Sequence, residues 1–166
     1  GTLNQVVHLW SYDDLNDRAD ARARLGQNAD WANDYVAHVR PLIRRQEIRL
    51  MHPRLPLTAP ENEGNVYEYR YYKTHMGEAP SWTKAIMDVM PARERYSKNV
   101  CLWHTEAENP NEVSHMWAYK DLNERTAARA KTAADPDWQA FLKSAGGKLE
   151  EMQNMLLIPA PFSPLK

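Results

Sequence analysis

The chain has 166 residues, and its 21 Lys and Arg residues nearly balance its 22 Asp and Glu residues, for a formal net charge of −1. This balance argues against a general binder of nucleic acid or of anionic membranes, which needs surplus positive charge. No apolar run approaches the roughly 20 residues of a membrane span, and no signal peptide is visible. The single cysteine, Cys101, cannot form an internal disulfide, so we expect a soluble protein in the cytoplasm.

Three elements are predicted in the first 56 residues. Residues 6–12 alternate with a period of two, which is typical of a strand. Asp14 then begins a helix, because a second carboxylate three residues later, Asp17, resembles the capping box that satisfies the first free N–H groups. The short apolar run 47–51 comes shortly before a proline and predicts a final strand.

A linker and three further elements follow. Residues 57–65 are rich in Pro, Asn and Glu and predict a linker. Residues 66–73 alternate as a strand, and residues 80–97 place apolar side chains at helical spacing. Another strand is predicted at 99–105, and the sequence Glu-Asn-Pro-Asn at 108–111 predicts a turn.

The next elements repeat the first ones. Residues 111–125 match residues 4–18 without a gap, at an offset of 107 residues (111 minus 4), and the match includes a Trp pair and a Tyr pair. The strand and the capped helix therefore recur, and Asp135-Pro136 marks a further helix start. The apolar run 154–158 predicts the final strand.

The chain is thus predicted to contain two copies of one unit. Residues 1–56 hold the later part of a first repeat, and residues 66–166 hold a complete second repeat with the order strand, helix, strand, strand, helix, strand. That order predicts a ferredoxin-like α+β fold, in which helices cover one face of an antiparallel sheet. The first repeat lacks its opening strand and helix, either because the protein begins earlier and is trimmed or because a partner segment completes it.

The repeated motif resembles the central signature of the NIPSNAP family. Residues 6–15 and 113–122 share the pattern His-x-Trp-x-Tyr-x-Asp-Leu, residues 67–72 resemble the family's opening strand, and residues 135–142 and 159–165 resemble its helical and closing segments. The resemblance implies a dimeric α+β-barrel arrangement, in which two sheets pack face to face around a pocket. It implies no single reaction, because the wider superfamily includes cofactor-free oxygenases, haem enzymes and isomerases.

Polar and aromatic side chains share one face of the predicted strands. If this face lines the barrel, a carboxylate, a guanidinium, an imidazole and phenols meet in one concave site that could bind a carboxylate or move a proton. The alternative is that they only satisfy one another in a sheet-to-sheet interface. The candidate pocket residues are His8, Trp10, Tyr12, Glu68, Arg70, Tyr72, His115, Trp117 and Tyr119.

Arginine pairs give a second candidate site, for an anion. The pairs Arg18 and Arg22, and Arg125 and Arg129, lie four residues apart on a helix face, where they could grip a carboxylate or pair with acidic neighbours. The six histidines are scattered, without metal-ligand spacing, and no phosphate-binding loop is present. We expect no metal and no cofactor.

The predicted function is therefore the binding of a small organic molecule in a polar-aromatic barrel pocket, with metal-free catalysis as an extension. The alternative is a non-catalytic assembly or adaptor module that acts by self-association. Edge strands and an incomplete first repeat predict a homo-oligomer, or a partner segment that completes the first repeat.

Overall fold

The computed structural model describes residues 4–165, so the outermost residues of both predicted repeats lie outside the described part. The chain divides into two compact units, the first ending at Ile48 and the second beginning at Arg49. Among the described residues, no helix combines the length and the apolar character needed to cross a membrane.

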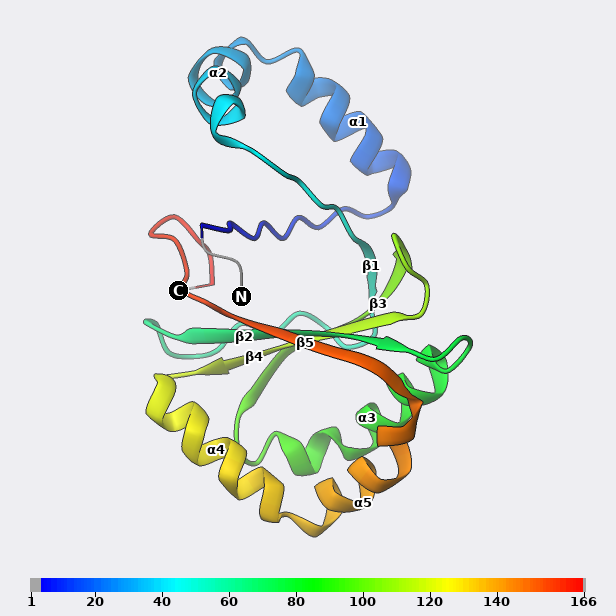
Figure 1. Cartoon of the computed structure of the whole chain (residues 1–166). Helices are drawn as coiled ribbons and strands as arrows, with labels where there is room; N and C mark the ends of the chain where they lie inside the picture. The colour runs from blue at the N-terminus through cyan, green and yellow to red at the C-terminus, as the bar shows by residue number, and fades with distance from the viewer. Residues whose placement is uncertain (1–3, 166) are drawn as a thin grey trace. The chain divides into compact units, whose positions relative to one another are not determined.

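The second unit is a five-stranded antiparallel sheet with three helices on one face (Figure 1). Its strand order is β1-β3-β4-β2-β5, and the last four strands in that order form the ferredoxin-like sheet of the second repeat. The predicted α+β class is confirmed. The strands are β1 (Leu50–Pro53), β2 (Val66–Thr74), β3 (Lys98–Ala107), β4 (Glu112–Tyr119) and β5 (Leu149–Leu157), and the helices are α3 (Ala79–Arg93), α4 (Leu122–Ala134) and α5 (Pro136–Ala145), followed by the short 3-10 turn η3 (Gly146–Lys148).

Carboxylate caps set the starts of α4 and α5. The Asp121 carboxylate accepts the backbone N–H of Glu124 at 2.7 Å, and the Asp135 carboxylate accepts the backbone N–H of Asp137 at 2.9 Å. Each cap satisfies a donor that the first helical turn leaves free. Both helices therefore begin where the sequence predicts.

The strand β1 belongs to the first repeat but pairs with the second. Met51 lies opposite Thr105 of β3, and Pro53 lies opposite Trp103. The chain then stays close to β3, since the backbone N–H of Thr58 donates to the Val100 carbonyl at 2.8 Å. The final strand predicted at 47–51 thus forms slightly later, and β3 of the second repeat is its sheet partner.

The first unit is helical. The helix α1 (Leu15–Gly26) begins after Asp14, whose carboxylate accepts the backbone N–H groups of Asn16 and Asp17 at 2.7 and 2.9 Å. Trp31 stacks on Tyr35 with 4.1 Å between ring centroids. The helical segments that follow α1 are the π-helical η1 (Trp31–Val36), α2 (Ala37–Val39) and the 3-10 turn η2 (Arg40–Leu42).

The strand predicted at residues 6–12 is wrong, because these residues form no strand and most of them are exposed. Their counterpart in the second copy, β4, is paired on both edges, by β2 and by β3. The described residues contain no first-copy equivalents of those two strands, and a strand needs partners for its backbone N–H and C=O groups. The copies therefore fold differently over this segment, although α1 and α4 begin at matching positions.

The sheet of the second unit carries a separate core on each face. On the helix-covered face, Trp82, Ile86 and Val89 of α3 and Phe141 of α5 pack in one core with Val113 and Trp117 of β4. On the helix-free face, the core is made of Tyr67, Tyr69, Val100, Cys101, Trp103, Met116 and Ala118.

Candidate functional site

The second-copy pocket candidates all lie on the helix-covered face. Arg70 of β2 lies opposite His115 of β4, and Glu68 lies opposite Trp117. The expected orientation into a barrel is therefore wrong for these residues, and the pleat turns Tyr67 and Tyr69 to the helix-free face instead. Every residue of β4 is buried, so both of its faces are covered. The sequence pattern of β4 therefore could not show which of the two faces meets the helices.

The first-copy candidates lie in the first unit, outside any strand. His8 and Trp10 are exposed, Tyr12 is half-buried, and the rings of His8 and Trp10 meet edge to face with 6.5 Å between centroids. Arg18 and Arg22 lie on α1, and neither forms an ion pair among the described residues.

The fully buried Glu68 carboxylate is the centre of a polar cluster. It accepts hydrogen bonds from Arg70 Nη1 at 2.6 Å, from Arg125 Nη2 at 2.7 Å and Nε at 3.1 Å, and from Asn154 Nδ2 at 2.8 Å. Arg129 Nη1 lies 3.7 Å from the same carboxylate. We call this group the Glu68 cluster: Glu68, Arg70, Tyr72, Arg93, His115, Trp117, Tyr119, Arg125, Arg129 and Asn154. It joins the second-copy pocket candidates to the second-copy anion candidates.

The Glu68 carboxyl is ionised at neutral pH. Burial alone would raise its pKa, but hydrogen bonds from Arg125 and Asn154 and the charge of Arg70 lower the pKa to about 2. A carboxylate held in this way is a weak base, and it serves as an anchor for the arginines around it.

Arg93 is a member of the cluster that the sequence analysis did not single out as a site residue. It is buried near the end of α3, where its Nη2 donates to the Tyr119 hydroxyl at 3.3 Å and its Nη1 to the Ser97 hydroxyl at 2.5 Å. Its guanidinium lies 4.2 Å from the Trp117 ring centroid, a cation–π contact. It forms no ion pair among the described residues. The sequence feature that could have identified Arg93 is its position at the end of the apolar face of α3.

His115 is a buried neutral imidazole with one unused nitrogen. Its Nδ1 accepts the indole N–H of Trp117 at 2.5 Å. Burial, together with the charges of Arg70 and Arg93, places its pKa well below the usual value for histidine. A neutral ring that accepts at Nδ1 carries its hydrogen on Nε2, and this Nε2 has no hydrogen-bond partner among the described residues.

The Glu68 cluster carries a surplus of positive charge. It contains four arginines and one carboxylate, so its formal charge is +3 (4 minus 1). Such a group can bind an anion or orient a carbonyl. The described residues contain no set of His, Cys, Asp and Glu side chains arranged to hold a metal ion.

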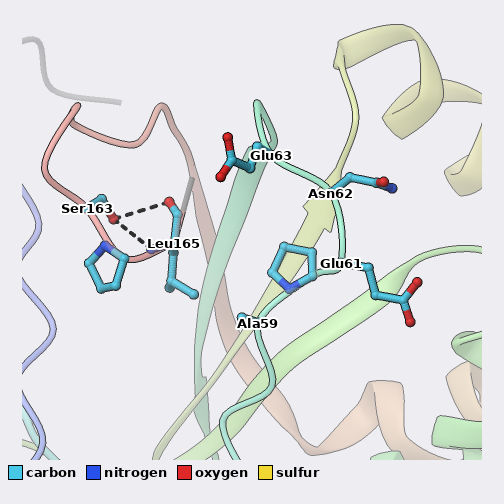
Figure 2. Close-up of a pocket in the computed structure, with 8 residues that line it drawn as sticks. Ala59, Glu61, Asn62, Glu63, Ser163 and Leu165 are labelled. Atoms are coloured by element: carbon cyan, nitrogen blue, oxygen red, sulfur yellow. Dashed lines mark hydrogen bonds between the residues drawn. The ribbon is translucent and has the colours of Figure 1, made fainter.

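Two surface pockets of the second unit lie away from the predicted site residues. Figure 2 shows the first, of about 380 Å³, between linker residues 59–63 and residues 163–165, where the Leu165 backbone N–H donates to the Ser163 hydroxyl at 3.1 Å. The second, of about 740 Å³, is an open groove lined by α3 and α5. Neither pocket includes a residue of the Glu68 cluster.

Comparisons with known proteins agree with this architecture. A family model described as NIPSNAP matches residues 1–55 and 67–164. The human protein NipSnap homolog 3A is 33% identical over 170 aligned residues, which cover 100% of this chain and 68% of that protein. The crystal structure of an uncharacterised NIPSNAP domain protein from Burkholderia xenovorans is 33% identical and has a TM-score of 0.57, covering 60% of this chain and 98% of its own.

A more distant structure shares the fold alone. A putative monooxygenase from Lactobacillus acidophilus has a TM-score of 0.61 at 16% identity, covering 86% of this chain and 66% of its own. This likeness carries no reaction to the present chain. The matched family model and the human relative settle the classification: the chain belongs to the NIPSNAP family.

Proposed function

We propose that this protein binds a small organic molecule at the Glu68 cluster of its second repeat. The observation that carries the proposal is the buried Nε2–H of His115, which has no acceptor among the described residues. Buried polar groups in native proteins almost always have a hydrogen-bond partner. A ligand oxygen that reached this nitrogen would supply one.

The cluster reaches the surface at its arginine end. The side chains of Arg70, Arg125 and Arg129 are 15%, 20% and 44% exposed. Arg70 lies opposite His115 in the pairing of β2 with β4. A molecule that contacts Arg70 from solvent would therefore lie one side chain away from the imidazole.

The chemistry of the cluster supports binding more than proton transfer. A general base works best when its pKa is near the operating pH, whereas the pKa of Glu68 is about 2. His115 is neutral and already accepts the Trp117 indole N–H, so its remaining capacity is to donate one hydrogen bond. The site is suited to hold a molecule and to polarise a carbonyl group.

Nuclear magnetic resonance of the whole chain tests the proposal. The protein is titrated with a set of neutral, cationic and anionic organic fragments, and the signals of His115 Nε2 and of the Trp117 indole are followed. We expect at least one fragment to move both signals saturably while the signal of the exposed Trp10 indole stays in place. If no fragment moves the His115 and Trp117 signals at millimolar concentration, the proposal is refuted.

Self-association is a second candidate function, favoured by the free edge of the sheet. The strand β5 is the terminal strand in the described sheet and pairs only with β2. An unpaired strand edge offers a row of N–H and C=O groups to another chain. We expect sedimentation velocity to show a dimer that forms as protein concentration rises, and a monomer at every concentration would exclude this function.

A further inference from the structure

Arg129 is the arginine of the Glu68 cluster with the most unused donor capacity. Arg125 holds Glu68 through two hydrogen bonds and Arg70 holds it through one. Arg129 lies 3.7 Å from the carboxylate, forms no hydrogen bond among the described residues, and is 44% exposed. A guanidinium has five N–H donors in a planar fork that matches a carboxylate.

The neighbouring arginines increase the local preference for an anion. Burial lowers the pKa of Arg93, and the like charge of Arg129 lowers it further. Glu68 is the only carboxylate that forms an ion pair with Arg70, Arg125 or Arg129 among the described residues. Glu68 alone does not neutralise the repulsion between these arginines. A second negative charge at the exposed arginine end of the cluster would therefore reduce this repulsion.

Exposed apolar side chains of β5 lie next to Asn154, the member of the Glu68 cluster on that strand. On β5, Asn154 lies opposite Arg70 and donates to Glu68, so it points to the helix-covered face. Side chains two residues apart on a strand share a face, which places Met152 and Leu156 on either side of Asn154. Met152 is 65% exposed and Leu156 is 48% exposed.

We infer that the ligand of the Glu68 cluster is an organic carboxylate with an apolar chain, whose carboxylate binds Arg129 beside Arg70 and whose chain covers Met152 and Leu156. This inference rests on the proposed function and names the substrate class of the same site. Arg129 supplies the charge-assisted hydrogen bonds. Met152 and Leu156 supply apolar area that a chain removes from water.

Calorimetric titration of the whole chain separates the contribution of the ligand's charge from that of its apolar chain. We expect octanoate to bind with a dissociation constant of about 1 mM or tighter. Octanamide, which has the same length without the charge, should bind about tenfold more weakly or worse, because it cannot form charge-assisted hydrogen bonds with Arg129. Acetate is also expected to bind more weakly than octanoate, because it has no chain to cover Met152 and Leu156.

Paired variants locate the binding. Arg129→Gln is expected to weaken octanoate binding about tenfold, whereas Lys131→Gln, which removes the same charge from the exposed side of α4, leaves it unchanged. Met152→Ser is expected to weaken octanoate but not acetate, and Met76→Ser, at an exposed loop methionine, affects neither.

Three results would overturn the inference: octanamide binding as tightly as octanoate, Arg129→Gln binding octanoate as the unchanged chain does, or an absence of octanoate binding. If neutral fragments still move the His115 and Trp117 signals in any of these cases, the proposed small-molecule site stands and only the carboxylate class is lost. If no fragment moves them, both fail.

Discussion

Replacing Glu68 by glutamine removes the one negative charge of the Glu68 cluster while it keeps the size of the side chain. In the native protein the carboxylate accepts hydrogen bonds from Arg70, Arg125 and Asn154 at 2.6–3.1 Å. The amide of Glu68→Gln has one acceptor oxygen, and its NH₂ group faces guanidinium donors. The arginines then remain close together without a counter-charge.

The burial of the Glu68 ion pairs sets the loss of stability expected for Glu68→Gln. Removing one partner of a buried ion pair costs about 3–5 kcal/mol, and the partial exposure of the three ion-paired arginines favours the lower end of that range. Independently, the pKa of Glu68 is lowered from 4.5 to about 2. At about 1.4 kcal/mol for each pKa unit this corresponds to about 3 kcal/mol, and to about 2–3 kcal/mol after allowance for solvent screening. We expect Glu68→Gln to lower the free energy of unfolding by about 3 kcal/mol.

The pH dependence gives a second signature. Because the folded pKa of Glu68 lies below its unfolded value, the carboxylate stabilises the fold fully above a pH of about 5, and this stabilisation is lost as the pH falls towards about 2. Urea unfolding followed by tryptophan fluorescence, at neutral pH and at several acidic values, measures both effects. The difference between the native chain and Glu68→Gln should shrink as the pH falls.

A matched variant controls for the loss of a surface charge. Glu151 pairs with Lys73 at 3.2 Å, and both side chains are almost half exposed, so Glu151→Gln should cost less than about 1 kcal/mol. If Glu68→Gln costs no more than Glu151→Gln, or if its deficit does not depend on pH, the account of Glu68 as the charge that holds the arginines is refuted.

Three further predictions follow from single side chains. His115 should remain neutral as the pH falls through 6, because burial and two arginines lower its pKa; nitrogen NMR that shows an imidazolium at pH 6 would contradict this. Burial raises the pKa of the Cys101 thiol to about 11, so iodoacetamide at pH 8 should modify it much more slowly in the folded chain than in urea, and equal rates would exclude a buried thiol. Asp135→Ala removes the cap of α5 and one of the two carboxylate partners of Arg95, and should cost about 1–2 kcal/mol in urea unfolding; no loss would show that the cap is dispensable.

The sequence predicted those elements whose causes are local. Asp14, Asp121 and Asp135 begin their helices because each carboxylate reaches a backbone N–H only two or three residues away. The alternation of residues 66–73 likewise identified β2. The segment 6–12 has the same alternation, but no strand of the described residues pairs with it, and a strand depends on partners that its own residues cannot provide.

The sequence predicted which strand residues of the Glu68 cluster lie together, but not the helix residues that join them. Glu68, Arg70 and His115 come together as expected because β2 and β4 are neighbours in the ferredoxin-like order. Their meeting with Arg125 depends on where α4 crosses the sheet, which no pattern within α4 encodes. Arg93 was missed as a site residue because an arginine at the end of an amphipathic helix normally points to solvent.

The unbalanced charge of the Glu68 cluster supports the proposal of a ligand. Buried ion pairs are poor stabilisers, and apolar residues of similar size often replace them without loss. A cluster built for stability would also match its charges. Among the described residues, however, Glu68 is the one carboxylate that pairs with Arg70, Arg125 and Arg129, and Arg93 pairs with none. Glu68 neutralises the inner end of the cluster, and Arg129 remains at its more exposed end, while Met152 and Leu156 lie on either side of Asn154 on β5. The proposed ligand, an organic carboxylate with an apolar chain, would bring a negative charge to Arg129 and an apolar group to Met152 and Leu156.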